Sequence, residues 1–314
     1  MSVEVRRYGP DLAQEWDRLV YNSRNGLFLF RRGYMDYHAD RFADMSAMAY
    51  VDGDLAAVLP ASFDRESGRA SSHGGLTFGG VLFRRDLRGD VALRVIDALL
   101  DALKSWGASE LEVRLLPQFL ASYPSAELDY ALWRRGFSLV RRDLSSAIPL
   151  GDGLPFNSSK KQAIAKAAKA GLAVGEGSFA DFHMLLQEVL EARHGVEPVH
   201  ALAELQLLSS RFPDEILLRS VEKDGHMLAG AVVYRYPKAW HTQYMAASGE
   251  GRGMGALDLV IAGLIDEARH AGAAWFSFGT STTNQGTELN EGLLWQKESF
   301  GARSVTHDFM RGTL

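Results

Sequence analysis

Three ionisable side chains near the C-terminus have the types that proton transfer and charge stabilisation require. Lys297, in QKESFG (296–301), can stabilise a negative charge that develops during a reaction. His241, in the run AWHTQYMAAS (239–248), titrates near neutral pH and is a candidate general base. Tyr244 of the same run is a candidate proton donor or substrate contact. Each also has a structural explanation, such as a lysine that closes a helix C-terminus.

The run that carries His241 and Tyr244 is rich in aromatic and apolar residues and is predicted to form a strand. Successive side chains of a regular strand point to opposite faces of the sheet. We therefore expect Tyr244 on the face opposite to His241.

A glycine-rich bend, SGEGRGMGA (248–256), follows this run and opens the next predicted helix. Glycines let the backbone approach a ligand, and a helix start favours an anion. The candidate contacts to the phosphates of a donor are Gly251, Arg252, Gly253, Gly255 and, from the polar loop GTSTTNQG (279–286), Asn284. Glycine-rich helix starts are also common without a ligand.

A polar cluster surrounds the turn RHGVEPVHALAE (193–204), where Arg193, His200 and Glu204 are candidate substrate contacts. His200 and Glu204 are four residues apart and share a face if the next helix begins early. They lack a convincing third ligand, so no metal site is predicted. Helix capping and a surface ion pair are the alternatives.

In the N-terminal half, four residues are candidate contacts to an acceptor substrate. These are Tyr37, His38, His73 and Thr77. The last two lie in SSHGGLTFGG (71–80), which has too many glycines for an ordinary strand interior. Close backbone packing or a bulge is the structural alternative.

The composition narrows the class of protein. A length of 314 residues favours two domains. A net charge of −5 and a pI of about 6.0 give no overall positive field for DNA or anionic membranes. The absence of cysteine excludes disulfides, thiolate metal sites and a cysteine nucleophile. No apolar run suggests a signal peptide or a membrane span, so we expect a cytoplasmic protein without membrane insertion.

The order of predicted elements is repeated along the chain. The first half contains two helices, a hairpin turning at Asp52-Gly53, a strand, an amphipathic helix (92–103), a strand and a helix ending in Leu-Trp. The same order returns about 165 residues later, with its hairpin turn at Asp224-Gly225. We interpret the chain as two copies of one α/β domain, residues 1–150 and 151–314, although two unrelated α/β stretches can agree by coincidence.

This order resembles the GNAT acyltransferase fold, in which the central strands splay apart and an acyl donor lies in the gap. Two such units in one chain resemble the FemAB-type transferases. The basic segment SSKKQAIAKAAKAG (158–171), the pair Phe278-Gly279 and QKESFG (296–301) are similar to segments of those enzymes. More narrowly, YH (37–38), SHGGLTFGG (72–80) and PVH (198–200) resemble bacterial FemAB-related proteins that are often encoded with cell-surface polysaccharide genes.

The resemblance implies a fold class and a function. The fold would be α/β (α+β), with two tandem GNAT-like domains, each a mixed sheet flanked by helices. Only the second domain would keep a donor site, and Lys297 would stabilise the negative charge that develops at the reacting centre. The chain would be an N-acyltransferase that moves an acyl group from acyl-CoA, such as acetyl-CoA, to an amine on a sugar-nucleotide or lipid-linked precursor of the cell envelope or of a polysaccharide.

Two alternatives stay open at this point. The Fem resemblance implies an aminoacyl-tRNA donor as the runner-up, and the basic segment 158–171 would suit a tRNA. The other alternative is a binding protein with a degenerate donor site. Trp295 favours it, because many GNAT enzymes have a tyrosine acid near that place, and so does Glu250, where the family pattern has Gln or Arg.

Overall fold

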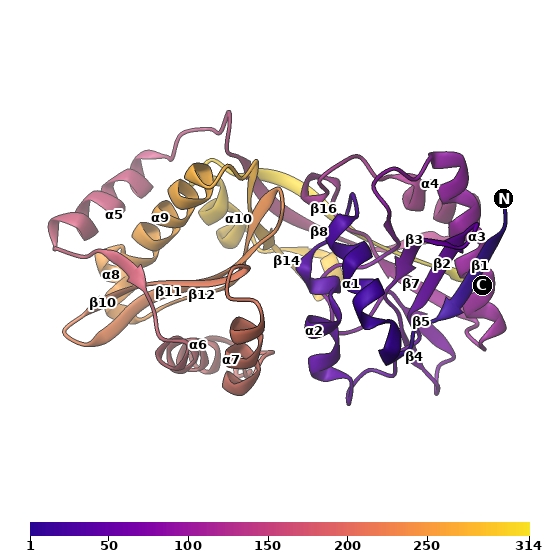
Figure 1. The fold of residues 1–314 in the computed structure, drawn as a ribbon. Coiled ribbons are helices and arrows are strands. Elements are labelled where there is room, and N and C mark those ends of the chain that lie inside the picture. Colours follow the sequence, from indigo (N-terminus) through magenta and orange to yellow (C-terminus); the bar gives the residue numbers. More distant parts are fainter. The chain divides into compact units, whose positions relative to one another are not determined.

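The computed structural model describes residues 1–314, apart from the side chains of Arg193 and His194. The chain forms two units (Figure 1). Unit 1 contains Met1–Asp143, Asn284–Glu288 and Thr306–Leu314, and unit 2 contains Leu144–Thr283 and Leu289–Val305. The two units are not contiguous stretches of the chain that meet at residue 150. The end of the C-terminal strand pairs with a strand of unit 1 and therefore belongs to that unit.

Unit 1 has a four-stranded sheet in the order β1-β2-β3-β6, and its strands β4, β5 and β7 belong to a ten-stranded sheet that continues through β16 and β8. Its strands are β1 (Val3–Arg7), β2 (Ala47–Val51), β3 (Asp54–Leu59), β4 (Ser62–Asp64), β5 (Arg69–Ser71), β6 (Leu82–Phe83) and β7 (Glu110–Arg114). Its helices are η1 (Pro10–Leu12), α1 (Ala13–Asn22), η2 (Phe28–Phe30), α2 (Arg32–Met35), η3 (Asp36–His38), α3 (Gly89–Ser105), η4 (Gln118–Leu120), α4 (Glu127–Arg134) and η5 (Asn284–Gly286). Three strands contribute residues to both units: β8 (Ser138–Pro149), β15 (Glu288–Leu289) and β16 (Arg303–Thr313).

The core of unit 1 forms where α3 packs on the four-stranded sheet. The predicted apolar stripe of this helix is fully buried: Ala92, Val95, Ile96, Leu99, Leu100 and Leu103. The spacing places these side chains on one face of the helix, and burial of each large one contributes about 1.5–3 kcal/mol.

The strand predicted between the first hairpin and the amphipathic helix (92–103) is short: of residues 76–83, only Leu82–Phe83 is a strand. A side chain at Gly79 would lie 2.3 Å from the Ser72 carbonyl oxygen, and Gly80 has a φ of +107°. The prediction of a longer strand is therefore wrong, because the backbone folds closely on itself here and leaves the extended conformation.

Unit 2 is built on the strand order β8-β13-β12-β11-β10-β9. The strands beyond β8 are β9 (Val174–Glu176), β10 (Ile216–Lys223), β11 (His226–Arg235), β12 (Ala239–Ala247), β13 (Trp275–Thr280), β14 (Thr282–Thr283) and β15 (Glu288–Leu289). The helices are α5 (Ser158–Lys169), α6 (Phe179–His194), α7 (Leu202–Arg211), α8 (Gly249–Met254), α9 (Ala256–His270) and α10 (Glu291–Glu298). Figure 1 shows α5 and α9 on one face of this sheet and α6 and α7 on the other.

The two predicted hairpin turns have the same backbone geometry. Asp52 and Gly53 have φ angles of 50° and 94°, and Asp224 and Gly225 have 52° and 78°. Positive φ at both central residues defines a turn whose twist matches that of the flanking strands. The two units therefore share this turn, as well as an amphipathic helix that packs on a sheet.

The central strands of unit 2 separate after a short parallel contact. β12 and β13 pair only over Ala239–His241 and Trp275–Ser277. Beyond these residues β12 stays with β11, whereas β13 stays with β8 as far as Thr280. Beyond His241 and Ser277, the facing edges of β12 and β13 therefore do not pair with each other. Their backbone N–H and C=O groups on these edges are available to a ligand.

A bulge in β12 changes which side chains share a face. The register shifts between Val232 and Val233 of β11, so that Gln243 is the extra residue of β12. Trp240 and Met245 both pack in the core on the α9 side. His241 and Tyr244, which neighbour these two, therefore lie on the same, α6 side. The expectation of opposite faces is wrong because it assumed an unbroken alternation.

Within the described part of the chain, no helix is both long and apolar enough to span a bilayer.

Candidate active site in unit 2

Lys297, on α10, is buried at the end of β13, with only 2% of its surface exposed. Its Nζ donates hydrogen bonds of 2.9 Å to the carbonyl of Gly279 and 2.9 Å to Ser281 Oγ, and a third to the carbonyl of Thr280. Burial lowers the pKa of Lys297 to about 8. Among the described residues no carboxylate pairs with it, so a cation held by neutral oxygens lies at this point.

The segments that carry the FemAB resemblance meet around Phe278. The ring of Phe278 packs against Phe300, at 5.9 Å between centroids, in the core on the α9 side. Lys160 of α5 lies over the Phe300 ring at 4.8 Å and forms an ion pair of 2.5 Å with Asp258. The segments near residues 160, 278 and 300 are thus one packed unit, and Lys160 points inward rather than to solvent.

His241 lies where β12 and β13 part. It is 6% exposed, and its Nδ1 is 3.0 Å from Ser277 Oγ on β13. A Cβ added at Gly279, which has a φ of +69°, would lie 3.4 Å from the His241 ring. The Lys297 ammonium bonds the carbonyl of this same glycine. Gly279 therefore separates His241 from Lys297, and a side chain there would crowd the ring.

Tyr244, which is partly buried, and His200, which is buried, form a hydrogen-bonded pair on the α6 side. His200 Nδ1 is 2.5 Å from the Tyr244 hydroxyl, and His200 is 5% exposed. Burial raises the pKa of Tyr244 to about 12, so the phenol keeps its proton at neutral pH. His183 Nε2 lies 3.2 Å from the His200 carbonyl. No local pattern in the sequence indicates this pair, because its members are 44 residues apart.

Other predicted residues of unit 2 have local partners. The carboxylate of Glu204 accepts a hydrogen bond of 2.9 Å from the Ala201 N–H at the start of α7. This is the capping alternative of the sequence analysis, and His200 turns instead to Tyr244. Arg193, also predicted in this cluster, lies outside the described side chains.

The glycine-rich bend has two glycines that the fold itself requires. A Cβ at Gly251 would lie 2.1 Å from the Leu228 carbonyl oxygen, and one at Gly255, which has a φ of +77°, 2.5 Å from that of Ala163. Gly253 differs, because a Cβ there would meet nothing within 4 Å. Close packing thus accounts for the first two glycines without any ligand, and of the three only Gly253 has open space where a side chain would lie.

Two cations lie beside the open glycine. Lys166 Nζ, from α5, donates a hydrogen bond of 2.6 Å to the Gly253 carbonyl. Arg252 precedes Gly253, and its Nη1 donates one of 2.7 Å to the Ala247 carbonyl. An exposed backbone with two cationic side chains fits a phosphate group. Glu250, on the preceding turn of α8, forms an ion pair with Lys223. Its negative charge does not favour a phosphate group at this place.

The predicted acceptor residues of unit 1 form an aromatic stack. His38 and His73 are buried with ring centroids 5.2 Å apart, and Tyr37 stacks on His38 at 4.2 Å. Burial lowers the pKa of His73 to about 3, so the ring is neutral at physiological pH. Thr77 is exposed. Contact of these residues with an acceptor stays a prediction.

The remaining sequence candidates lie at the surface. Asn284, predicted beside the glycine bend, is exposed and belongs to unit 1, where its amide donates to Glu288 at 3.3 Å. Trp295 and Trp133, the tryptophans of the repeated Leu-Trp phrase, are 58% and 69% exposed. Among the described side chains, no group of three or more His, Cys, Asp or Glu is placed to hold a metal ion.

Comparison with known proteins identifies the class. Residues 158–286, almost all in unit 2, match the family model of the acetyltransferase (GNAT) domain. No curated protein matches the sequence significantly. The matched part of unit 2, which carries the split strands, is therefore a GNAT domain, and the prediction of a transferase is confirmed.

Solved structures place the whole chain in one fold. FemX is 14% identical with a TM-score of 0.70, over 99% of this chain and 97% of FemX. A tandem GNAT protein from the clavulanic acid biosynthesis pathway is 12% identical, with a TM-score of 0.54 over 99% and 98% of the two chains. The C-terminal domain of a putative lysylphosphatidylglycerol synthetase from Agrobacterium fabrum is 13% identical, with a TM-score of 0.55 over 82% and 81%. The chain thus has a FemAB-related, tandem GNAT fold, as the sequence predicted.

Proposed function

We propose that this protein transfers an acyl group from an activated donor to an amine, at the split between β12 and β13 of unit 2. The observation that carries the proposal is the end of the parallel pairing at His241 and Ser277, next to the buried ammonium of Lys297. An acyl chain that contains amides can pair with the free strand edges there, as an added strand does. The carbonyl to be attacked then lies near a positive charge.

The residues at the split suit the proton and charge movements of acyl transfer. The amine must lose a proton to attack, and in this proposal the His241 imidazole at the split accepts it. Attack forms a C–N bond and places negative charge on the carbonyl oxygen, which the potential of Lys297 stabilises. Collapse breaks the bond to the leaving group, which takes a proton. Tyr244, which keeps its proton and lies on the same side of β12 as His241, supplies it.

Acyl-CoA, and acetyl-CoA in particular, is the first candidate donor, because the matched domain is an acetyltransferase domain. The open space at Gly253 between Lys166 and Arg252 supports it, since two cationic side chains beside open space suit the diphosphate of coenzyme A. Of the predicted contacts, Gly251 and Gly255 would act only through the shape of the bend.

Aminoacyl-tRNA is the second candidate donor. Helix α5 exposes Lys161, Lys166 and Lys169 and has no acidic residue, so it presents a cationic face to solvent. A polyanionic nucleic acid binds such a face through its phosphates. The fold shared with FemX and with the domain of a putative lysylphosphatidylglycerol synthetase supports this candidate.

For the acceptor we propose an amine on a sugar-nucleotide or lipid-linked precursor of the cell envelope or of a polysaccharide. The fold shared with a domain of a putative lysylphosphatidylglycerol synthetase, an enzyme named after a lipid, supports an envelope component. Both donors occur in the cytoplasm, where we place the reaction.

An assay of transfer tests this function. The protein is mixed with acetyl-CoA, or with a mixture of charged tRNAs, and with a panel of amines that includes amino sugars and amino-lipids. Loss of the donor and acylation of the amine are followed together. We expect transfer by the wild type, a loss of at least 100-fold in Lys297→Met, and little change in the control Lys104→Met, which removes an exposed lysine of unit 1. Equal rates in all three proteins would refute the assignment of Lys297.

A further inference from the structure

The His241 ring is held at one edge by a serine of the neighbouring strand. Its Nδ1 lies 3.0 Å from Ser277 Oγ, and these two residues form the last pair of the contact between β12 and β13. Ser277 is 2% exposed, and its neighbours Phe276 and Phe278 belong to the core on the α9 side. Because side chains alternate along a strand, the Ser277 hydroxyl lies on the α6 side together with His241.

Two further contacts set the direction of the opposite edge of the ring. Tyr236 stacks on His241, with ring centroids 6.0 Å apart and an angle of 25° between the planes. A Cβ added at Gly279 would lie 3.4 Å from His241 Cε1 and 3.8 Å from His241 Nε2. Gly279 follows Ser277 by two residues on β13, beyond the end of the pairing with β12. The Cε1–Nε2 edge of the imidazole therefore faces the split where the donor is proposed to lie.

The two ring nitrogens of His241 thus have different surroundings. In a neutral imidazole one nitrogen carries a proton, and the other has a lone pair that accepts one. A base that acts on a molecule in the split needs its lone pair on Nε2, the nitrogen on the Gly279 side, so its proton must be on Nδ1. A serine hydroxyl accepts a hydrogen bond from an N–H group as readily as it donates one, and Ser277 Oγ lies at the right distance from Nδ1.

We propose that Ser277 is a positioning residue for His241, which holds the imidazole in the tautomer that carries its proton on Nδ1. In this tautomer Nε2 takes the proton from the attacking amine, and the imidazolium that forms keeps its Nδ1–H bond to Ser277 Oγ. The ring releases the proton to solvent when the product leaves, so Ser277 neither gains nor loses one. The inference rests on the proposed acyl transfer, because it assigns how the base of that same site is prepared.

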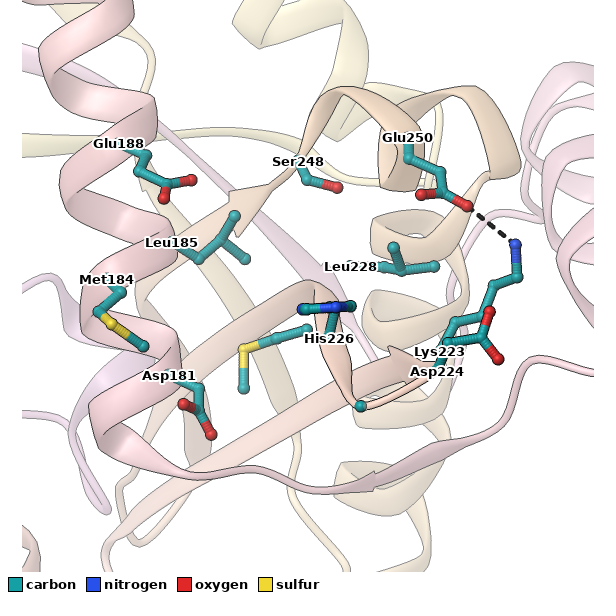
Figure 2. Close-up of a pocket in the computed structure, with 12 residues that line it drawn as sticks. Asp181, Met184, Leu185, Glu188, Lys223, Asp224, His226, Leu228, Ser248 and Glu250 are labelled. Atoms are coloured by element: carbon teal, nitrogen blue, oxygen red, sulfur yellow. Dashed lines mark hydrogen bonds and ion pairs between the residues drawn. The ribbon is translucent and has the colours of Figure 1, made fainter.

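Nitrogen NMR of protein with labelled histidine tests the tautomer without any substrate. The nitrogen shifts of a neutral imidazole differ between the two tautomers, and the signals of His241 are those that are lost in His241→Asn. At about pH 8, where a histidine of ordinary pKa is neutral, we expect a protonated Nδ1 in the wild type and a mixture of tautomers in Ser277→Ala. The control is His226, which is exposed and lines the pocket in Figure 2, a pocket that no residue of the split lines. Its signals should be the same in both proteins.

Kinetics of four variants separate the hydrogen bond from the packing of the side chain. Ser277→Ala removes the acceptor, Ser277→Cys nearly keeps the shape but accepts only weakly, and Ser277→Thr keeps a hydroxyl. Ser220→Ala is the matched control, because Ser220 is also 2% exposed and lies on β10 of the same unit. We expect kcat to fall about 10- to 100-fold in Ser277→Ala and Ser277→Cys, with less than about twofold change in the KM of the donor. Ser277→Thr and the control should stay within about threefold of the wild type.

Three results would overturn the proposal: a neutral His241 with its proton on Nε2 in the wild type, a wild-type kcat in Ser277→Ala, or an equal loss in Ser277→Ala and Ser220→Ala. The last would mean that the loss comes from the packing of a buried serine. If the wild type transfers no acyl group from either donor to any amine, the proposed function fails, and the NMR spectra alone decide whether Ser277 holds the tautomer. Circular dichroism of each variant confirms that it is folded before the measurements.

Discussion

From the burial of the Lys297 ammonium we predict a pH dependence of folding stability, which can be measured without a substrate. The ordinary pKa of a lysine is 10.5, and burial lowers that of Lys297 to about 8. Between these two values the unfolded chain binds a proton that the folded chain has released, so folding stability rises with pH across this window. The full difference corresponds to about 3 kcal/mol, and about 2.5 kcal/mol of it is expressed between pH 7 and pH 10.

The assay is urea denaturation of the wild type and of Lys297→Met at pH 7 and pH 10. Other titrating groups contribute equally to both proteins and cancel in the difference. We expect the stability of the wild type relative to Lys297→Met to increase by about 2.5 kcal/mol from pH 7 to pH 10. The exposed control Lys104→Met should show no such increase. An unchanged difference for Lys297→Met would refute the conclusion that Lys297 is a buried cation without a counter-charge.

Three further predictions concern the site. Acyl transfer should fall above about pH 8 if the charged form of Lys297 is the active one, which a pH–rate profile checks; a rate that keeps rising to pH 9.5 would mean that the neutral amine is required. Tyr244→Phe should lower kcat by about 10²-fold with little change in Tm, and a wild-type rate would remove the tyrosine from the mechanism. Gly255→Ala should lose about 2 kcal/mol of stability in urea unfolding, because its φ is +77° and the Ala163 carbonyl is close, whereas Gly253→Ala should lose none; similar losses would contradict the packing account.

Short-range signals in the sequence predicted much of the fold. The turns at Asp52-Gly53 and Asp224-Gly225 and the apolar stripe of residues 92–103 depend on neighbours within a few positions, and all three form as expected. The limits of the units depend on distant pairing instead. Phe309–Thr313 pairs with β7, about 200 residues earlier, and nothing local in the C-terminal segment signals this.

The candidate site was predicted as a set of residue types and not as an arrangement. One extra residue, Gln243, puts Tyr244 on the face of His241, and a bulge of this kind leaves no mark in the alternation of residue types. The partner of Tyr244 is His200, from a turn far along the chain. Glycine occurs both where a backbone approaches a ligand and where two backbone segments pack closely. The sequence does not distinguish these two uses, so Gly251 and Gly255 were predicted as phosphate contacts, whereas the structure shows close packing.

The donor is proposed to lie in the split between β12 and β13, and hydrogen–deuterium exchange tests this position most directly. The backbone amides of Thr242–Ala247 and Phe278–Thr280 are compared with and without acetyl-CoA, and then with and without charged tRNA. We expect one of the two donors to slow exchange in both segments, because it covers the unpaired strand edges, and to leave the β2–β3 hairpin of unit 1 unchanged. A donor that is turned over by the protein but protects neither segment would contradict the proposed site.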